Sequence, residues 1–498
     1  MSFLSFKLPH PLLSVFTLGV LGAYGMGPFY FWPALTLSLS LFWLVLTSYG
    51  DKPSWKSALC GFLFGFGYFT GSLWWIGNAL LIDGSPYVWV YPLAVCGIPA
   101  LLSLFPALAA FLIRRFFAGR SLSSFAAYIG LMFTAEYARG HLFTGFPWNL
   151  FGMSWTSTLP MLQILSLGGV YLLSFLTIFM FSVPAFAWKG TSSRTIRYAL
   201  VVTALMIGAG SYAYGWQRLT QHPTIYNSDV LVQLVQPSIP QEDKWNWDKM
   251  WDNTRKTISL MESNPSRKGN DEPPSTRVVI LPETALTYHH LSNLAALDAL
   301  TGRLRGYPED HVYLATGLLQ HDGEHYHNSL AVMDRSGHIV TSFDKFHLVP
   351  FGEYIPLQKL FPFGPIARFS GFETGGGPRT LSVDGVPPFS PLVCYEVIFP
   401  SEVTARDEEH PSWMLNVTND AWYGISPGPF QHLAQAQYRA IEEGLPIVRV
   451  ANTGISGIFD AYGRPVLLTG LFSESNNESY LPLPAADVTP YVRLRGLY

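Results

Sequence analysis

The sequence predicts two parts of different kinds: a polytopic α-helical membrane domain in residues 1–217 and a soluble α/β domain in residues 218–498. The first observation is charge. Residues 1–215 hold ten Lys/Arg and three Asp/Glu, a net charge of +7, whereas residues 216–498 hold 21 and 31, a net charge of −10. The second is that long apolar runs occupy the first part, and short β-rich runs with turns occupy the second. A single soluble fold does not divide charge and hydropathy in this way.

The first part contains seven apolar stretches long enough to cross a hydrocarbon core, which takes about 20 residues as a helix. The expected spans are residues 10–27, 29–48, 56–82, 88–113, 122–138, 161–188 and 197–215. The first two form a tight pair joined at Gly27-Pro28. A cleaved signal peptide is the alternative for the first span, but no small-x-small site follows it before the second span begins. We therefore interpret it as a retained helix.

Basic residues set the expected orientation, because Lys and Arg in short loops stay on the cytoplasmic side. With the N-terminus inside, only Arg139 lies in an outer connection. The inside segments carry Lys7, Lys52, Lys56, Arg114, Arg115, Arg120, Lys189, Arg194 and Arg197. Seven crossings then place everything after Arg218 outside the cytoplasm. We expect a multi-pass protein of a bacterial inner membrane, with its second domain in the periplasm.

Cysteine usage singles out one thiol. Cys60 and Cys96 lie in expected spans, so Cys394 is the only cysteine of the soluble part. It has no disulfide partner there, and no Cys or His spacing indicates a metal site. We expect neither a metal nor a cofactor. A lone thiol in an oxidising compartment is a liability unless it is buried or used.

The soluble part alternates short strands with helices, which predicts an α/β domain with helices outside packed sheets. The expected strands are Val230–Gln236, Thr276–Leu281, Val312–Thr316, Ser329–Met333, His338–Phe343, Leu392–Cys394, Trp413–Val417, Ile447–Ala451 and Ile458–Asp460. The expected helices are Trp247–Asn264, Asn293–Arg305 and Phe430–Gly444.

Three reactive side chains each follow a predicted strand: Glu283, Lys345 and Cys394. Loops at strand ends are where catalytic groups usually sit. A thiol with an ordinary pKa of about 8.5 needs activation, and a carboxylate can take its proton and later return it. Lys345 and a backbone N–H, that of Tyr395, can stabilise the oxyanion formed on attack at an ester or amide. The acyl group then rests on sulfur as a thioester, which an amine or water can attack.

Each of these residues also has a structural interpretation. Cysteine at a strand end is more often a small buried apolar residue than a nucleophile. Glu283 could favour a helix N-terminus, and Lys345 could be a solvated hairpin charge. The sequence motifs that surround these three residues are more specific than the residues themselves.

The motifs Pro282-Glu283-Thr284, 345–353 (KFHLVPFGE) and Cys394-Tyr395-Glu396 resemble the Glu-Lys-Cys motifs of the nitrilase, or carbon–nitrogen hydrolase, superfamily. Segments 416–422 and 450–457 resemble later strands of that domain. Seven preceding spans, with Gly145-Phe146-Pro147-Trp148 in an outer loop, make the chain similar to the membrane-bound apolipoprotein N-acyltransferase branch. The resemblance covers almost the whole chain.

The resemblance implies an αββα sandwich in residues 218–498 and a triad of Glu283 (base and acid), Lys345 (oxyanion stabiliser) and Cys394 (nucleophile). It implies an acyl donor that is a membrane phospholipid, and an acceptor that is the α-amino group of a diacylglyceryl-cysteine at the start of an apolipoprotein. It further implies supporting or substrate-contacting roles for Glu353, Tyr395, Glu396 and Trp245. Glu353 and Glu396 could equally be structural, and Trp245 could be core packing. No nucleic-acid partner is expected.

Two further readings stay open at this stage. A membrane-anchored amidase would use the same thioester with water as acceptor. A transporter with an outer binding module would need ionisable groups deep in its spans, whereas these lie at span margins, as Glu136 does. The family usually has a helix after the soluble domain, and no apolar span follows here. Either this member lacks that helix or the sequence is truncated, and we expect seven spans.

Overall fold

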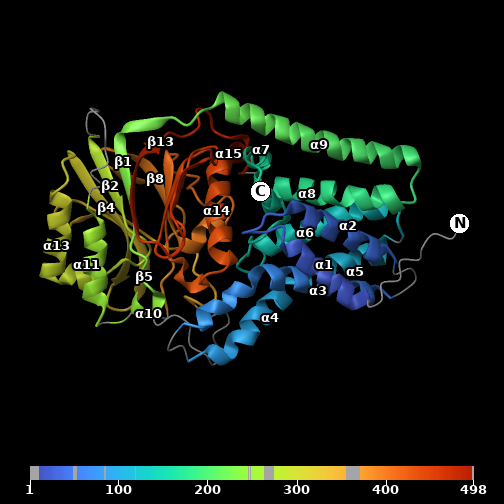
Figure 1. The fold of residues 1–498 in the computed structure, drawn as a ribbon, viewed down its shortest axis with the longest axis horizontal. Coiled ribbons are helices and arrows are strands. Elements are labelled where there is room, and N and C mark those ends of the chain that lie inside the picture. The colour runs from blue at the N-terminus through green and yellow to red at the C-terminus, as the bar shows by residue number, and fades with distance from the viewer. Residues whose placement is uncertain are drawn as a thin grey trace. The chain divides into compact units, whose positions relative to one another are not determined.

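The computed structural model describes residues 11–48, 53–82, 86–117, 119–244, 246, 248–262, 274–354 and 371–495 (Figure 1). The chain forms two compact units. The first consists of Met1–Gly77 and Trp89–Gln221, and the second of Asn78–Val88 and His222–Tyr498.

The regular structure of the first unit is helical in the residues that the structure describes. Its α-helices are α1 (Pro11–Ala23), α2 (Trp32–Ser48), α3 (Ser54–Leu73), α4 (Tyr91–Leu102), α5 (Leu104–Phe116), α6 (Leu122–His141), α7 (Leu159–Leu162), α8 (Leu165–Lys189) and α9 (Arg194–Gln221). Short 3₁₀ segments are η1 (Trp74–Leu80), η2 (Val88–Val90) and η3 (Phe151–Trp155). Every predicted span overlaps at least one helix. Residues 161–188 are divided between α7 and α8, and Gly168 and Gly169 leave helical geometry inside α8.

These helices form the polytopic membrane domain that the apolar runs predict. Four helical stretches in the described chain are long and apolar enough to cross a bilayer: Ser54–Leu80, Val88–Phe116, Leu165–Lys189 and Arg194–Gln221. Two shorter apolar helices are Leu12–Ala23 and Trp32–Ser48. Very little of the apolar stretch of α9 is buried in protein, as expected for a helix surrounded by lipid. The total of seven crossings stays a prediction.

A buried ion pair holds the loop after α6. Glu136 and Arg139 are both buried, with Arg139 Nη2 3.8 Å from Glu136 Oε1. Arg139 Nη1 donates to the carbonyls of Phe146 and Trp148 at 2.6 and 2.8 Å. Glu136 Oε1 accepts the Phe151 N–H at 2.9 Å. The one basic residue that the charge count assigns to an outer connection is therefore enclosed in the protein, where it satisfies loop carbonyls.

The second unit is built on two sheets. One has the order β13-β1-β2-β4-β5-β6, with β3 beside β4, and the other has the order β12-β11-β10-β9-β8-β7. The strands of the first sheet are β1 (Tyr226–Gln236), β2 (Thr276–Ile280), β3 (Leu286–Thr287), β4 (His311–His321), β5 (Tyr326–Met333), β6 (Ile339–Asp344) and β13 (Ser475–Pro482). Those of the second are β7 (Leu381–Val383), β8 (Val386–Val393), β9 (Trp413–Thr418), β10 (Ile447–Ala451), β11 (Gly457–Phe459) and β12 (Pro465–Leu468).

The two sheets pack face to face with helices outside, which confirms the αββα sandwich. Alternate residues of a strand point to opposite faces, so Val278 and Ile280 of β2 enter the core between the sheets, where Trp413 and Leu415 of β9 also lie. Val279 instead faces the outer cluster with α13. Figure 1 shows α11 (Met250–Leu260) and α13 (Leu294–Arg305) along the first sheet and α14 (Pro427–Glu443) on the opposite side. The remaining helical elements are α10 (Gln241–Lys244), α12 (Tyr288–Ser292), α15 (Pro490–Leu494), η4 (Cys394–Ile398) and η5 (Asp420–Tyr423).

All nine predicted strands and all three predicted helices of the soluble part have a counterpart in the structure. Ile447–Ala451 (β10) has its predicted bounds, and the others differ at one or both ends. Four strands have no counterpart among the predicted ones: β3, β7, β12 and β13. The first two are only two and three residues long. The polar sequence SNNESYLP of β13 has low strand propensity. Its pairing with the apolar strand β1, over the register Tyr226↔Pro482 to Gln236↔Ser475, is a long-range contact.

The direction of the strands determines at which edge of each sheet the loops that carry the candidate residues lie. Strands β1, β2 and β4 run parallel, and two antiparallel steps through β5 make β6 parallel to them. Strands β8, β9 and β10 are likewise parallel. Because parallel strands end at the same edge of a sheet, the loops after β2 and β6 share one edge of the first sheet. The loops after β8 and β9 share one edge of the second.

We predict that Gly317→Ala displaces the loop after β2. A Cβ on Gly317, in β4, would lie 2.3 Å from Thr284 N and 2.4 Å from Glu283 Cα, so the loop must move. We expect a loss of about 1–3 kcal/mol of unfolding free energy, measured by thermal unfolding in detergent. Gly302→Ala in α13 is the control, since its nearest neighbour would be 3.9 Å away and alanine favours a helix. Equal stability of Gly317→Ala and the wild type would contradict the prediction.

Candidate active site

Glu283 stands on a tight turn directly after β2. Thr284, the next residue, has a φ of 48°, in the left-handed region that non-glycine residues seldom adopt. The carboxylate is 6% exposed, and Glu283 Oε1 accepts a hydrogen bond from Asn328 Nδ2 at 2.8 Å. The turn and this bond hold a carboxylate in a largely water-free position.

Lys345 follows β6 and is 1% exposed. Its Nζ lies 2.9 Å from the Glu353 carboxylate and 3.6 Å from Glu283 Oε1. Burial alone lowers the pKa of a lysine, but Glu353 and Glu283 outweigh it and raise the pKa of Lys345. The ammonium therefore stays charged, and it cannot act as a base.

Glu353 closes the loop that begins at Lys345. Besides its ion pair, it accepts the Val349 N–H at 2.8 Å and the Asn328 Nδ2 at 3.0 Å. Asn328 thus bridges the carboxylates of Glu353 and Glu283. The structure places Glu353 as the main counter-ion of the lysine and as the acceptor that shapes its loop.

Cys394 lies where β8 ends and η4 begins. Its φ of 53° is left-handed, and it is 7% exposed. Burial raises the pKa of the Cys394 thiol; Glu283 raises it further and Lys345 lowers it. Two contacts bring the loops after β2, β6 and β8 together at one site. Lys345 Nζ lies 3.6 Å from Glu283 Oε1, and the Phe346 N–H donates to Glu396, two residues after Cys394, at 2.7 Å. The resting form is the neutral thiol, which needs a base before it can attack.

Glu396 joins two of these loops through backbone hydrogen bonds. Its Oε2 accepts the Val393 N–H at 2.6 Å, and its Oε1 accepts the N–H groups of Phe346 and His347 at 2.7 and 3.3 Å. Complete burial raises the pKa of Glu396 to about 8, against the lowering effect of these donors. The contacts are those of a brace between the thiol loop and the lysine loop.

Tyr395 has its ring packed edge-on to Phe399, with centroids 5.1 Å apart. Burial raises the pKa of its phenol. Its backbone N–H is the second of η4, and the first N–H groups of a helix have no acceptor within that helix. The amide expected to stabilise the oxyanion therefore lies next to Cys394 in the chain, and its role stays a prediction. Trp245 lies outside the described residues.

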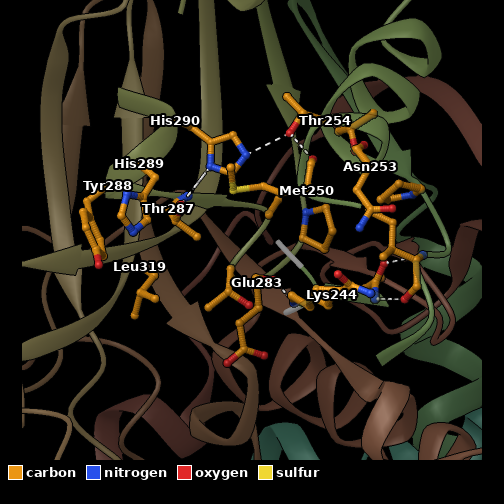
Figure 2. Close-up of a pocket in the computed structure, with 18 residues that line it drawn as sticks. Lys244, Met250, Asn253, Thr254, Glu283, Thr287, Tyr288, His289, His290 and Leu319 are labelled. Carbon is orange, nitrogen blue, oxygen red and sulfur yellow. Dashed lines mark hydrogen bonds between the residues drawn. The ribbon is translucent and has the colours of Figure 1, made fainter. Parts of the chain in front are cut away.

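A pocket that is open to solvent lies beside Glu283. Figure 2 shows Lys244 and Glu283 at one end of it and His290 with Thr254 at the other. Lys244 Nζ donates to the backbone carbonyl of Glu283 at 2.8 Å. Burial lowers the pKa of Lys244 to about 8, while Glu283 and Cys394 act to raise it. Sequence reasoning gave Lys244 no role, because its contact with Glu283 joins distant segments.

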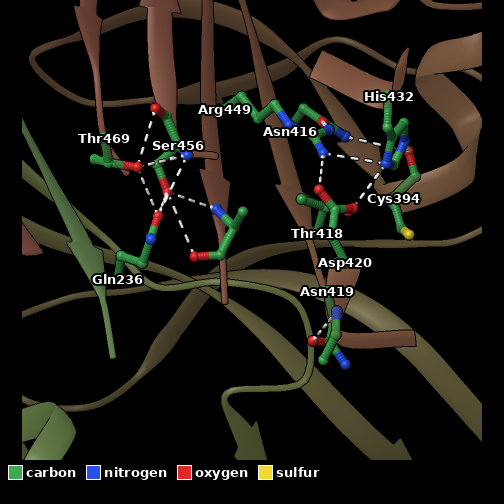
Figure 3. A network of polar contacts seen from close by, with 12 residues as sticks. Gln236, Cys394, Asn416, Thr418, Asn419, Asp420, His432, Arg449, Ser456 and Thr469 are labelled. Carbon is green, nitrogen blue, oxygen red and sulfur yellow. Dashed lines mark hydrogen bonds and ion pairs between the residues drawn. The ribbon is translucent and has the colours of Figure 1, made fainter. Parts of the chain in front are cut away.

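A second buried polar cluster lies behind Cys394 (Figure 3). It contains Asp420, His432 and Arg449, each at most 1% exposed. Arg449 Nη2 donates to Asp420 Oδ2 at 2.7 Å, and His432 Nδ1 lies 2.8 Å from Asp420 Oδ1. Sequence reasoning missed this cluster as well. Arg449 within the apolar strand IVRVA was the available signal, since arginine is almost never fully buried without a partner.

Two family models match the chain in the order of its two units. The model described as the apolipoprotein N-acyltransferase N-terminal domain matches residues 18–183, and the carbon–nitrogen hydrolase model matches residues 204–481. The chain is therefore a membrane protein with a carbon–nitrogen hydrolase domain. A solved CN-hydrolase superfamily protein from Xanthomonas campestris is 19% identical, covering 54% of this chain and 95% of that protein with a TM-score of 0.37.

Curated relatives show which family of carbon–nitrogen hydrolase proteins the chain is similar to. The apolipoprotein N-acyltransferase of Rhodopseudomonas palustris is 38% identical over 493 residues, covering 96% of this chain and 90% of the relative. That of Bradyrhizobium diazoefficiens is 36% identical over 499 residues, covering 97% and 91%. The chain belongs to the apolipoprotein N-acyltransferase family.

We predict that Glu396→Ala destabilises the protein strongly. It leaves three backbone N–H groups without their acceptor, and each such buried group costs about 1–3 kcal/mol. We expect a large fall in the thermal unfolding midpoint. Glu402→Ala is the control, because the Glu402 carboxylate is about half exposed and pairs with the His347 side chain of the lysine loop. An unchanged midpoint for Glu396→Ala would show that the two loops hold each other by other means.

Proposed function

We propose that the protein transfers a fatty acyl chain from a membrane phospholipid, through a thioester on Cys394, to the N-terminal amine of a diacylglyceryl-cysteine in an apolipoprotein. The supporting observation is the meeting of a buried carboxylate, ammonium and thiol in a chain of the apolipoprotein N-acyltransferase family. The alternative, a membrane-anchored amidase, would pass the acyl group to water.

Glu283 is the proposed general base. The Cys394 thiol is neutral at rest, so its proton must leave as sulfur attacks, and Lys345 is already charged. Glu353 accepts bonds from Lys345, Asn328 and Val349 and serves as the counter-ion. Glu283 has the longer contact with Lys345, at 3.6 Å against 2.9 Å for Glu353, so its carboxylate is less engaged with the lysine.

The first half-reaction balances with these groups. Glu283 takes the thiol proton while sulfur attacks the ester carbonyl, and the carbonyl electrons move to oxygen. The Lys345 ammonium and the Tyr395 N–H stabilise that oxyanion. Collapse expels the lysophospholipid alkoxide, which takes the proton from Glu283 and leaves the acyl group on sulfur.

The second half-reaction repeats the sequence with an amine. The amine attacks the thioester and gives a proton to Glu283, and the same donors hold the oxyanion. The thiolate then leaves and takes the proton back, so the enzyme returns to its starting state with an amide as product. Water in place of the amine would give the amidase reaction, and the chemistry of the three groups is the same for both.

The membrane domain suits this pair of substrates. Moving a lipid chain into water costs about 0.8 kcal/mol per CH₂ group, more than about ten kcal/mol for a long chain. An enzyme anchored by its own helices avoids most of that cost, because both the donor and the diacylated acceptor stay in the bilayer.

Mass spectrometry of the enzyme tests the proposal. After incubation with phospholipid vesicles, we expect a long-chain acyl adduct on Cys394, absent from Cys394→Ser and present in the control Cys96→Ser. A diacylated lipopeptide should remove the adduct and become an N-acyl amide. Removal by water alone would favour the amidase, and absence of any adduct would contradict both functions.

We further propose that the catalytic domain lies on the periplasmic side of the inner membrane. The support is the charge count, with nine of ten basic residues of the first part in alternate segments. In a Cys96→Ser background, Asp407→Cys should react with a membrane-impermeant maleimide in intact spheroplasts. Arg115→Cys, also exposed, should react only after permeabilisation. The reverse pattern would invert the orientation.

A further inference from the structure

The backbone carbonyl of Cys394 receives two side-chain donors from the second sheet and α14. His432 Nε2 lies 3.2 Å from this oxygen, and Asn416 Nδ2 lies 3.5 Å from it and 3.3 Å from the Leu392 carbonyl. Figure 3 shows His432 between Cys394 and the cluster of Asp420 and Arg449. The proposed mechanism uses neither His432 nor Asn416.

One arginine orients both donors. Arg449 Nη1 donates to Asn416 Oδ1 at 2.6 Å, which turns the amide nitrogen of Asn416 toward the carbonyls. Arg449 Nη2 donates to Asp420 Oδ2 at 2.7 Å, and Asp420 Oδ1 lies 2.8 Å from His432 Nδ1. The chain of contacts therefore starts at Arg449 and reaches Cys394 by two routes. Every side chain in it is fully or almost fully buried.

The hydrogen-bond partners of His432 show which of its ring nitrogens carries a hydrogen toward Cys394. A carbonyl oxygen only accepts hydrogen bonds, so Nε2 must carry a hydrogen. Nδ1 can donate to Asp420, or accept from Arg449 Nη2 at 3.1 Å. With Nε2 protonated, the first arrangement is the doubly protonated imidazolium and the second is the neutral Nε2–H tautomer, and each of these two forms donates to the Cys394 carbonyl.

Holding this carbonyl also sets the amide on the other side of the same peptide. The bond between Cys394 and Tyr395 is planar and trans, so its C=O and N–H point in opposite directions. Cys394 is held at a φ of 53°, a strained conformation for a non-glycine residue that persists only where its surroundings enforce it. A hydrogen bond at the oxygen also strengthens the N–H as a donor.

We propose that His432 is a positioning residue for oxyanion stabilisation. Its Nε2–H fixes the Cys394 carbonyl, and thereby aims the Tyr395 N–H at the oxyanion of the acylation transition state. The inference rests on the proposed role of the Tyr395 N–H. It adds that a residue 38 positions beyond Cys394 in the chain controls that donor without touching the substrate.

Two substitutions of His432 separate its two contacts. His432→Gln places an amide nitrogen near the position of Nε2 and keeps a donor for the Cys394 carbonyl. His432→Asn places its amide near Nδ1, keeps the contact with Asp420 and loses the one with Cys394. We expect single-turnover thioester formation to fall about 10- to 100-fold in His432→Asn, less than the roughly 100- to 1,000-fold loss when an oxyanion donor is removed, because the Tyr395 N–H is misaligned but still present. In His432→Gln it should stay within about threefold of the wild type.

A second readout distinguishes positioning from a structural role. Alkylation of Cys394 by iodoacetamide is a displacement at a saturated carbon and forms no oxyanion. Its rate should be unchanged in both variants, and acylation rates are expressed per alkylatable thiol so that unfolded protein does not count. His432→Met, which has a similar length and no donor, should share the defect of His432→Asn and replaces it if that variant does not fold.

The experiment separates failure of the His432 role from failure of the proposed function. Equal acylation rates in the glutamine and asparagine variants, or a parallel loss of alkylation, would overturn the role of His432 while wild-type thioester formation persists. Failure of the wild type to form any thioester would instead refute the proposed function, on which this inference rests.

Discussion

The geometry of the candidate site depends on one buried ammonium. Lys345 has almost no contact with water and lies between the carboxylates of Glu353 and Glu283, which Asn328 bridges from the other side. An ion taken out of water loses several kcal/mol of hydration, and removing one partner of a buried pair costs about 3–5 kcal/mol. The loops after β2 and β6 therefore cannot separate without leaving a charge unpaired. That constraint brings the proposed base and the proposed oxyanion stabiliser together before any substrate arrives.

The second sheet uses the same physics on the thiol side. Arg449 is buried in β10, where Asp420 compensates its charge and Asn416 accepts a further hydrogen bond. Asp420 has its pKa lowered to about 2, because Arg449 and His432 outweigh the raising effect of burial. The thiol loop is thus supported from behind by a charged cluster and tied to the lysine loop by Glu396. A left-handed cysteine persists here because the surrounding hydrogen bonds leave it no alternative.

Chemistry and location complement each other in the proposed function. A neutral thiol beside an ionised carboxylate resists adventitious reaction in an oxidising compartment, because the thiolate is the reactive form. In the proposed mechanism the carboxylate of Glu283 takes the thiol proton as sulfur attacks, so the reactive thiolate does not accumulate at rest. The apolar helices of the first unit keep such an enzyme among lipids, where an acyl donor is at its highest concentration.

The membrane helices and most strands of this protein can be predicted from its sequence, because the patterns that indicate them are local. Apolar runs of about 20 residues indicate membrane helices. Short β-rich runs such as Thr276–Leu281 indicate strands, and Glu283, Lys345 and Cys394 lie at the ends of such strands. Family motifs around these residues added Glu353, Tyr395 and Glu396. The pairing of the polar strand β13 with β1 did not follow from local pattern, because its partner lies far away in the chain.

What only the tertiary structure decided is which distant groups share a site and what each of them contacts. The distance of 3.6 Å between Lys345 and Glu283, the role of Glu396 as a brace and the left-handed backbone of Cys394 all arise from sheet register and burial. Lys244 and His432 stand in unremarkable sequence, and their significance appears only where they meet Glu283 and Cys394. Local pattern records the neighbours of a residue along the chain, whereas pKa, hydrogen bonding and reactivity depend on neighbours in space.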